Sequence, residues 1–567
     1  MTVDYEKAEW TGMSLLRGKS NGSLLDIVSL AATAYLVRKE DTYKPEALQE
    51  LVDMEFKAYF DVRGHLFGFI NKFWDEIVEY SHSAELKELK AVALFARAAN
   101  RMDEVVATPL SIINTAEKLL DLQAGDTLLD QCAGPASLMT YMSMRHADVS
   151  FWGNEINTNS IVIMKIRSWL LDGQVQIKQG NAITEDLREL GANKVFSDHP
   201  WGVRNDHMVD MVRNDLRYVS YLEAFPKSKI LDWAFVLAAI FNRKKDGLSV
   251  VVVPTGMLSR TMRSEEILRT QLTEQGFLKA VISLPAKLYP NTAIEVSMLV
   301  LSNDNKDGVR MIDATTLGND SKIEKVFSEE DINSIMEWMI NDSEHSVLVS
   351  AEQLRKNDYS WNPARYLGAG IQMVENGMSL KALSVGTGRG KTIPRAELEM
   401  LTSDRPTKYQ YLMMQDIVDN RVVDNLINLT TFYEQYEKAL VHTNDLLISR
   451  TAPFKVAIMP DVKDRKIIAN GNFYIYSLNE DVINPVYAML YLRSAQGQQQ
   501  LNFAAHGSAL VSISNKDLES LEIPMIHKEE QDKIAERYMT LMDELDIVKR
   551  QEKLLYDKID GLMERGE

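Results

Sequence analysis

Hydrophobic and polar positions follow distinct patterns along the chain. Over the first 100 residues, apolar side chains recur at every third or fourth position, most regularly in residues 23–39 and 85–99. This period is typical of amphipathic helices. We therefore expect residues 1–100 to form a helical N-terminal domain.

From residue 101 to 370, short apolar runs alternate with helical stretches. Near-continuous apolar runs are typical of buried parallel strands. Strands that alternate with helices predict a doubly wound, Rossmann-like α/β sheet, whose ligands bind outside the carboxyl ends of the strands. The predicted strands are residues 126–131, 149–155, 175–180, 194–199, 248–254, 279–285 and 296–302.

Residues 371–530 mix short strands with polar loops, which predicts an α+β domain, and residues 531–567 predict one long charged helix. Apolar positions in this helix alternate at spacings of four and three, interrupted at Glu552, which is the period of a coiled-coil seam. The seam is formed by Ile534, Tyr538, Leu541, Leu545, Val548, Leu555, Ile559 and Leu562. Two interpretations stay open: a coiled-coil dimerisation helix, or an amphipathic helix packed on its own domain.

Composition narrows the class of protein. With 567 residues, 45% hydrophobic and 25% charged, the chain has the profile of a multidomain globular protein. It has no apolar run long enough to cross a bilayer and does not start like a secretory signal, so we expect a cytoplasmic protein. A single cysteine, Cys132, excludes a disulfide framework and a multi-cysteine zinc site, and we expect no metal. The net charge of -18 argues against coating nucleic acid by bulk charge, but a local basic face remains compatible with it.

Candidate chemistry lies after the first four predicted strands. The first strand runs into a small-residue turn around Gly134, which lets a ligand approach the backbone closely. Glu155 ends the second strand, where an acidic residue suits the two hydroxyls of a ribose. Asn181 follows the third strand, where an amide can bond an adenine edge. Each loop lies at the carboxyl end of a successive strand, so all of them face one crevice.

The fourth strand ends in Asp198-His199-Pro200-Trp201. An exocyclic amine is a poor nucleophile, and it needs acceptors that hold its hydrogens. Asp198 offers a side-chain oxygen and His199 its backbone carbonyl, while Pro200 fixes the turn. Trp201 offers a flat face for a flipped-out base. These four are the candidate catalytic residues; the alternative is an ordinary loop in a decayed enzyme.

The motifs in residues 100–370 resemble the modification subunits of type I restriction-modification systems, which are adenine-specific DNA amino-methyltransferases. The resemblance implies S-adenosylmethionine as cofactor and adenine N6 as target. It assigns donor binding to Thr108, Pro109, Asp130, Ala133, Gly134, Ala136, Glu155, Asn181 and Ala182. Three positions depart from the family pattern: Ala136 replaces a glycine, Asn181 an aspartate, and His199 the first proline of the tetrapeptide.

Residues 378–565 resemble half of a type I specificity subunit, which carries a target-recognition domain. Residues 442–451, HTNDLLISRT, carry the resemblance most clearly. It implies double-stranded DNA as partner, and a homodimer through the C-terminal helix would restore two recognition domains. The candidate DNA contacts are Arg450, Lys455, Lys463, Arg465 and Lys466. Each of them alone is more often a solvated surface charge.

Rival functions stay open. The first is a catalytically inactive, methylase-like DNA-binding scaffold, which the departures at Ala136 and His199 favour. The second is a cytosine-N4 DNA methyltransferase, because tryptophan closes the tetrapeptide in many such enzymes. A protein-glutamine or RNA methylase would leave the recognition domain without a purpose. The sequence has no P-loop and no endonuclease signature, so any restriction would need a separate endonuclease subunit.

Overall fold

The computed structural model describes residues 5–97, 106–221, 230–260, 262–290, 292, 294–303, 305–321, 323–367, 376–418, 421–505 and 512–565. The chain divides into two compact units, Met1–Leu367 and Gly368–Glu567. The expected domain boundaries at residues 100 and 370 lie outside the described residues.

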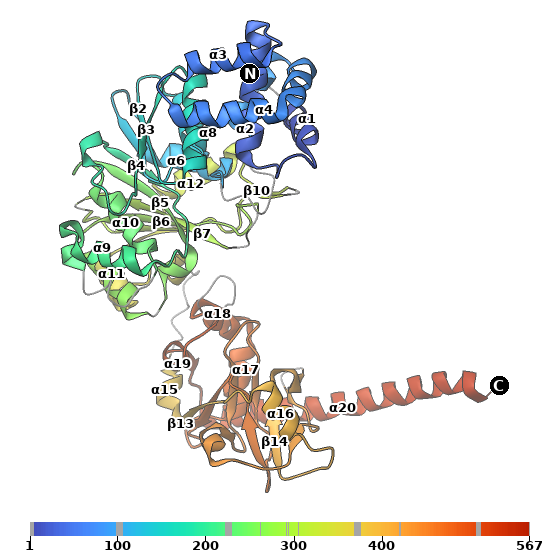
Figure 1. The fold of residues 1–567 in the computed structure, drawn as a ribbon. Coiled ribbons are helices and arrows are strands. Elements are labelled where there is room, and N and C mark those ends of the chain that lie inside the picture. Colours follow the sequence, from blue (N-terminus) through green and yellow to red (C-terminus); the bar gives the residue numbers. More distant parts are fainter. Residues whose placement is uncertain are drawn as a thin grey trace. The chain divides into compact units, whose positions relative to one another are not determined.

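The predicted helical N-terminal region is confirmed over its described residues. Its helices are α1 (Glu6–Leu16), α2 (Leu24–Glu40), α3 (Pro45–Glu55), α4 (Phe60–Ser83) and α5 (Leu86–Phe95). The Ser23 hydroxyl caps α2 by accepting from Asp26 N–H. α2, α4 and α5 pack around α8 (Thr158–Leu170) of the sheet domain (Figure 1), and α5 also contacts α7 (Ser137–Ser143).

A nine-stranded sheet in the order β11-β8-β6-β7-β5-β4-β1-β2-β3 forms the centre of the first unit. The seven predicted strands are β1 (Thr127–Asp130), β2 (Ser150–Glu155), β3 (Val175–Gln179), β4 (Lys194–Ser197), β5 (Leu248–Pro254), β6 (Leu278–Ser283) and β7 (Val296–Leu301). β8 (Val309–Asp313) and β11 (Ser346–Val349) extend one edge.

One strand direction differs from the prediction. β7 lies antiparallel between β5 and β6, whereas the apolar pattern predicts parallel strands throughout. A parallel neighbour needs a crossover connection, usually a helix. The connection from β6 to β7 contains no helix in its described residues, so the chain turns back alongside β6 in the opposite direction.

Both faces of the sheet are covered, which confirms the doubly wound α/β class. Leu128 and Leu129 are neighbours on β1, yet they belong to separate hydrophobic cores on opposite faces. The covering helices include α6 (Leu110–Leu120), α7 (Ser137–Ser143), α8, α10 (Asp232–Phe241), α11 (Arg263–Glu274) and α12 (Glu329–Trp338). Smaller elements are α9 (Asp206–Asn214), β9 (Asn319–Asp320), β10 (Lys325–Val326), α13 (Ala351–Lys356) and α14 (Ala364–Leu367).

The second unit is rich in short strands, as predicted. One sheet has the order β13 (Ser384–Arg389), β22 (Phe473–Leu478), β19 (Leu446–Ser449), β20 (Val456–Ile458). Another has the order β17 (Ile427–Leu429), β14 (Tyr409–Leu412), β21 (Lys466–Ala469), β18 (Leu440–Val441). Two-stranded sheets pair β12 (Gly377–Ser379) with β23 (Glu522–Pro524) and β15 (Ile417–Val418) with β16 (Arg421–Val422). The short helices are α15 (Leu380–Leu383), α16 (Arg395–Leu401), α17 (Pro485–Arg493), α18 (Ala495–Phe503) and α19 (Asn515–Glu519).

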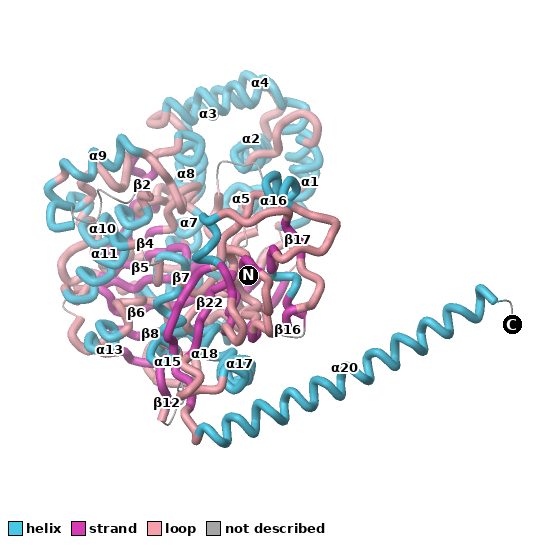
Figure 2. The backbone as a smooth tube through the Cα atoms, turned by 90° about the horizontal axis from the view of Figure 1, so that it is seen from below, coloured by secondary structure: helices cyan, strands magenta, loops and turns pink. Residues whose placement is uncertain are grey.

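The long C-terminal helix is α20 (Lys528–Arg565). Arg421 on β16 pairs with Asp546 of this helix at 2.9 Å, and the C-terminal part of α20 extends away from the other elements of the unit (Figures 1 and 2). Tyr538 of the predicted seam packs on the unit's core, and its hydroxyl accepts from Arg493 at 3.1 Å. The seam residues beyond it are 40–59% exposed where described: Leu541, Leu545, Val548 and Leu555. The side chains of Ile559 and Leu562 lie outside the described residues. No helix in the described parts of the chain is long and apolar enough to span a membrane.

Candidate active site

Hydrogen bonds join the loops at the carboxyl ends of β1 to β4. The Asn154 amide on β2 donates to the carbonyl oxygens of Gln131 (3.0 Å) and Gly180 (3.2 Å), which follow β1 and β3. The buried Gln131 amide donates to the Ser197 hydroxyl on β4 at 3.0 Å and to the Phe235 carbonyl on α10 at 2.9 Å. The four predicted loops therefore form one connected framework.

The loop after β1 has the backbone shape that the sequence predicts. Gly134 has a φ of 51°, and a Cβ on it would lie 3.4 Å from the Val106 carbonyl oxygen. Ala136, which is 1% exposed, also adopts a left-handed conformation with a φ of 61°, where glycine is favoured. Ala133 donates its N–H to the Asn154 carbonyl at 2.9 Å. Alanine at 136 thus keeps the turn at some conformational cost.

Asp130 and Glu155 differ in their surroundings. Asp130 is buried and accepts from Cys132 N–H at 3.3 Å, and burial raises its pKa well above the ordinary value. Glu155 stays partly exposed. It accepts from Gly134 N–H at 2.8 Å through one oxygen and from the N–H groups of Ile156 and Asn157, both at 2.7 Å, through the other. Three backbone N–H groups therefore hold the Glu155 carboxylate beside the loop that follows β1.

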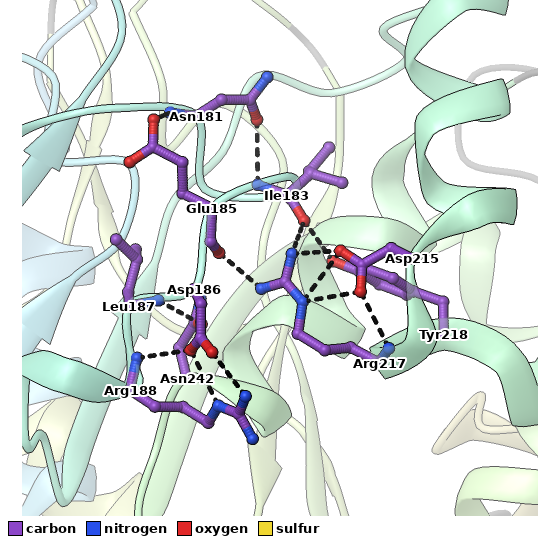
Figure 3. Close-up of polar contacts among 10 residues, drawn as sticks. All are labelled: Asn181, Ile183, Glu185, Asp186, Leu187, Arg188, Asp215, Arg217, Tyr218 and Asn242. Atoms are coloured by element: carbon purple, nitrogen blue, oxygen red, sulfur yellow. Dashed lines mark hydrogen bonds and ion pairs between the residues drawn. The ribbon is translucent and has the colours of Figure 1, made fainter.

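The Asn181 side chain has a defined orientation, because its oxygen accepts from Ile183 N–H at 3.0 Å. The amide nitrogen points away from the other residues of Figure 3. The sequence predicts an amide that can bond an adenine edge at this position; the structure turns the amide oxygen onto the backbone and leaves the amide nitrogen, a hydrogen-bond donor, outward. Ala182, the next residue, is buried.

This loop is braced by the segment after the tetrapeptide. The Arg217 guanidinium donates to the carbonyl oxygens of Ile183 (2.9 Å) and Glu185 (2.5 Å), and it pairs with Asp215 at 2.6 Å (Figure 3). The Tyr218 hydroxyl donates to the same Ile183 oxygen at 2.8 Å. The chain that follows Asp198 thus supports the loop that carries Asn181.

Asp198 lies where three segments of the chain converge. The Thr108 hydroxyl donates to Oδ2 and the Tyr289 hydroxyl donates to Oδ1, each at 2.8 Å. Asp198 is partly exposed. Burial raises the pKa of its carboxyl to about 6, while the two hydrogen bonds from Thr108 and Tyr289 lower it. Pro109 is the N-cap of α6, so Thr108 is fixed by the start of that helix.

The rest of the tetrapeptide is arranged around Asp198. His199 is 2% exposed and its ring stacks on Phe235 at 4.5 Å, and burial lowers its pKa to about 3. Pro200 is exposed, and Trp201 is partly buried and meets the Tyr289 ring at 4.9 Å in an edge-to-face contact. The buried Trp201 Nε1 has no hydrogen-bond partner among the described residues. The His199 ring therefore packs against Phe235 in a buried environment that disfavours its charged form.

The sequence analysis did not single out Tyr289, Gln131 or Arg167. Arg167 on α8 is buried and donates to the Pro135 carbonyl in the loop after β1 at 2.7 Å. Each is distant in sequence from the residue it holds. The one available signal was the position of Tyr289 after a predicted strand, at the same edge of the sheet as the tetrapeptide.

The five candidate DNA contacts have different environments. Lys455 donates to the carbonyl oxygens of Met414 (2.9 Å) and Ile417 (2.7 Å). Arg465 bonds the carbonyl oxygens of Asp461 (2.9 Å) and Val462 (3.2 Å). Both side chains therefore brace loops of the second unit.

The other three basic residues have fewer internal bonds. Arg450 lies 5.8 Å from the Tyr474 ring centroid and donates to Gly471 O at 3.4 Å. Lys463 and Lys466 are exposed, and the Lys466 ammonium lies 4.5 Å from the Phe432 ring centroid. These two lysines present charge at the surface of the unit.

The fold agrees with what family comparison shows. Residues 68–373 match the model of the N-6 DNA methylase family, and the chain belongs to that family. Residues 385–555 match the type I restriction modification DNA specificity domain. The chain therefore joins a type I methylase region and a specificity domain in one polypeptide.

Curated relatives have the same character. The chain is 25% identical over 324 residues to the type I restriction enzyme MpnII methylase subunit of Mycoplasma pneumoniae, covering 52% of this chain and 58% of the relative. It is 26% identical over 289 residues to the MjaVII methylase subunit of Methanocaldococcus jannaschii, covering 46% and 49%. The chain spans about half the length of these relatives.

Among solved structures, a type I methyltransferase subunit from Streptococcus thermophilus aligns with a TM-score of 0.46 and 18% identity, covering 63% of this chain and 98% of that one. The type IIG restriction endonuclease BpuSI aligns with a TM-score of 0.49 and 13% identity, covering 94% and 75%.

Proposed function

We propose that this chain transfers a methyl group from S-adenosylmethionine to adenine N6 at a specific site in double-stranded DNA. The observation that carries the proposal is the Asp198 carboxylate, held by Thr108 and Tyr289 beside Trp201. An acceptor next to an aromatic face is what a flipped-out base with an exocyclic amine requires.

The residues around the β1 and β2 loops fit the donor. The left-handed turn at Gly134 allows close approach to the backbone, and the oriented Glu155 carboxylate suits the two ribose hydroxyls. The outward nitrogen of Asn181 would donate to a ring nitrogen of the donor's adenine. Thr108 and Pro109 would lie at its methionine end. When bound, S-adenosylmethionine supplies an electrophilic methyl group.

Asp198 and the backbone carbonyl of His199 would accept the two amine hydrogens and turn the nitrogen lone pair out of conjugation with the base. Trp201 would stack on the base and hold the amine in line with the donor, so that orientation supplies much of the rate. A carboxylate with a pKa of about 6 can also take up the proton that the amine releases.

In chain order, we assign residues 1–100 to a helical region and residues 101–370 to the methyltransferase domain. Residues 371–530 would read the DNA site, and residues 531–567 would form the dimer. The exposed seam residues Leu541, Leu545, Val548 and Leu555 support pairing of two α20 helices, because an isolated stripe of this kind is normally covered. A twofold pair of recognition domains would read a palindromic, gapped site. Any restriction would come from a separate nuclease subunit.

The experiment is to express the chain in cells that lack other DNA methylation and to sequence their DNA with single-molecule detection of modified bases. We expect N6-methyladenine in one recurring motif. N4-methylcytosine would replace the proposal with the cytosine-N4 activity that Trp201 also allows. Unmodified DNA from cells that contain the soluble protein would favour the inactive scaffold.

A further inference from the structure

Hydroxyl groups from two distant segments hold the two oxygens of Asp198. Thr108 precedes α6, whereas Tyr289 lies in the loop between β6 and β7, and each donates over 2.8 Å. The torsion that turns a carboxylate plane is broad and costs little to change. A donor on each oxygen restricts that rotation, so the direction of the lone pairs at Asp198 is set from outside the tetrapeptide.

Tyr289 also contacts the proposed stacking residue. Its ring meets Trp201 at 83° with centroids 4.9 Å apart, a geometry that aromatic pairs favour. Tyr289 is 6% exposed. Two backbone hydrogen bonds hold its loop. At the base, Leu284 N–H donates to Val296 O at 3.0 Å, and on the flank, Lys325 N–H donates to Lys287 O at 2.7 Å. One anchored side chain therefore touches both the acceptor and the aromatic face.

We propose that Tyr289 is a positioning residue for methyl transfer, whose hydroxyl orients the Asp198 carboxylate and whose ring orients Trp201. This inference rests on the proposed function. An ionised carboxylate has about four lone-pair sites on its two oxygens, so two hydroxyl donors leave sites for the amine hydrogens. Tyr289 can thus stay bonded to Asp198 while the base is in place.

The same hydrogen bond affects the charge of Asp198, because a donor stabilises the ionised form and lowers the pKa. The titratable groups facing Asp198 are Asp130 and Cys132 of the β1 loop, His199 beside it, and Tyr289. Burial raises the pKa of Asp130 and of Cys132 and lowers that of His199 to about 3. Loss of the Tyr289 hydroxyl should therefore raise the pKa of Asp198.

The test compares Tyr289→Phe with wild type in the full chain. The variant keeps the ring and its contact with Trp201 but loses the hydroxyl. We expect kcat to fall on the order of tenfold, as expected for one misplaced acceptor, while the Kd values for donor and for DNA stay within about twofold. The acid limb of the kcat–pH profile should move to higher pH. In the Asp198→Asn background, Tyr289→Phe should shift no acid limb.

The matched control is Tyr80→Phe, which removes another buried tyrosine hydroxyl, bonded to Ala8 O at 2.8 Å in the helical region. It should leave kcat and the pH profile unchanged. If Tyr289→Phe melts at a far lower temperature than this control, a chain with 3-fluorotyrosine at position 289 is tested in its place. The fluorinated hydroxyl is a stronger hydrogen-bond donor, so the acid limb of the kcat–pH profile should move to lower pH.

The outcomes separate the two proposals. A wild-type chain that methylates no adenine defeats the proposed function. An active wild type, together with a folded Tyr289→Phe chain of unchanged kcat and unchanged acid limb, overturns the positioning role alone.

Discussion

The guanidinium of Arg167 donates a hydrogen bond to the main-chain oxygen of Pro135 over 2.7 Å. The same buried group donates to the carbonyl oxygens of Ala96 at 2.8 Å and Ala93 at 3.2 Å, at the end of α5. Burial lowers the pKa of Arg167 to about 10, which leaves it charged at neutral pH. The N-terminal helices and the proposed donor loop thus share one buried cation.

Arg167→Met should loosen the donor loop, because it leaves the Pro135, Ala93 and Ala96 oxygens without their donor. We expect a loss of about 3 kcal/mol in the free energy of unfolding and at least tenfold weaker donor binding by calorimetry. Arg243→Met is the control, since Arg243 is also buried but bonds Gly247 O at 3.0 Å, away from the donor loop. Equal donor affinity in the two variants would contradict the bracing role.

Gly134→Ala should impair donor binding. A side chain at this left-handed position costs about 1 kcal/mol, and its Cβ would lie 3.4 Å from Val106 O. Gly173→Ala provides the comparison, because Gly173 has a φ of 77° and open space where its Cβ would lie. Both variants should lose similar stability in urea melts, but only Gly134→Ala should raise the donor Kd. A raised Kd in both would point to a global effect.

Asn181→Asp tests the orientation of the amide. One carboxylate oxygen would still accept from Ile183 N–H, and the other would turn an acceptor outward in place of the present donor. The adenine amine of S-adenosylmethionine could then donate to this oxygen. We therefore expect the variant to prefer S-adenosylmethionine over an analogue that lacks the amine several-fold more than wild type does. Discrimination between the two ligands that is unchanged from wild type would show that Asn181 does not face the donor's adenine.

Methyl transfer should decline in acid with an apparent pKa of about 6, because protonation of Asp198 removes an acceptor for the amine. The folded carboxyl binds its proton more tightly than an unfolded one, whose pKa is near 3.8, so Asp198 makes the fold less stable as pH rises from about 4 to about 6. Asp198→Asn should remove that part of the stability profile. Asp198→Ala should lower kcat at least about a hundredfold, while the variant still binds S-adenosylmethionine and DNA. If this variant turned over at the wild-type rate, Asp198 would not be in the active site.

Leu545→Glu should dissociate the proposed dimer, because it puts a charge into the exposed stripe of α20. We expect light scattering to fall from twice the 64.4 kDa chain mass to one chain mass. Arg550→Glu changes an exposed residue away from the seam on the same helix and should leave the dimer intact. A wild-type monomer at micromolar concentration, or a methylated motif without a dyad, would leave α20 without this role.

Local patterns in the sequence determined the element types and the order of the loops. The apolar runs of β1 to β7 and the helical period before residue 98 depend on neighbouring residues, and these predictions are confirmed. The loops with Gly134, Glu155, Asn181 and Asp198 follow from strand order, because parallel strands end at one edge. The spacing also predicted which residues share the apolar stripe of α20, whereas their exposure came from the structure.

Tertiary structure decided what depends on partners distant in sequence. The direction of β7 depended on a connection from β6 whose described residues contain no helix, and the outward atom of Asn181 depended on a hydrogen bond from Ile183 N–H. Lys455 has the positive charge of a typical DNA phosphate contact, yet its ammonium donates to two carbonyl oxygens of the protein. Tyr289 meets Asp198 only because the β6–β7 loop folds over the end of β4, and no local pattern encodes a contact across 91 residues.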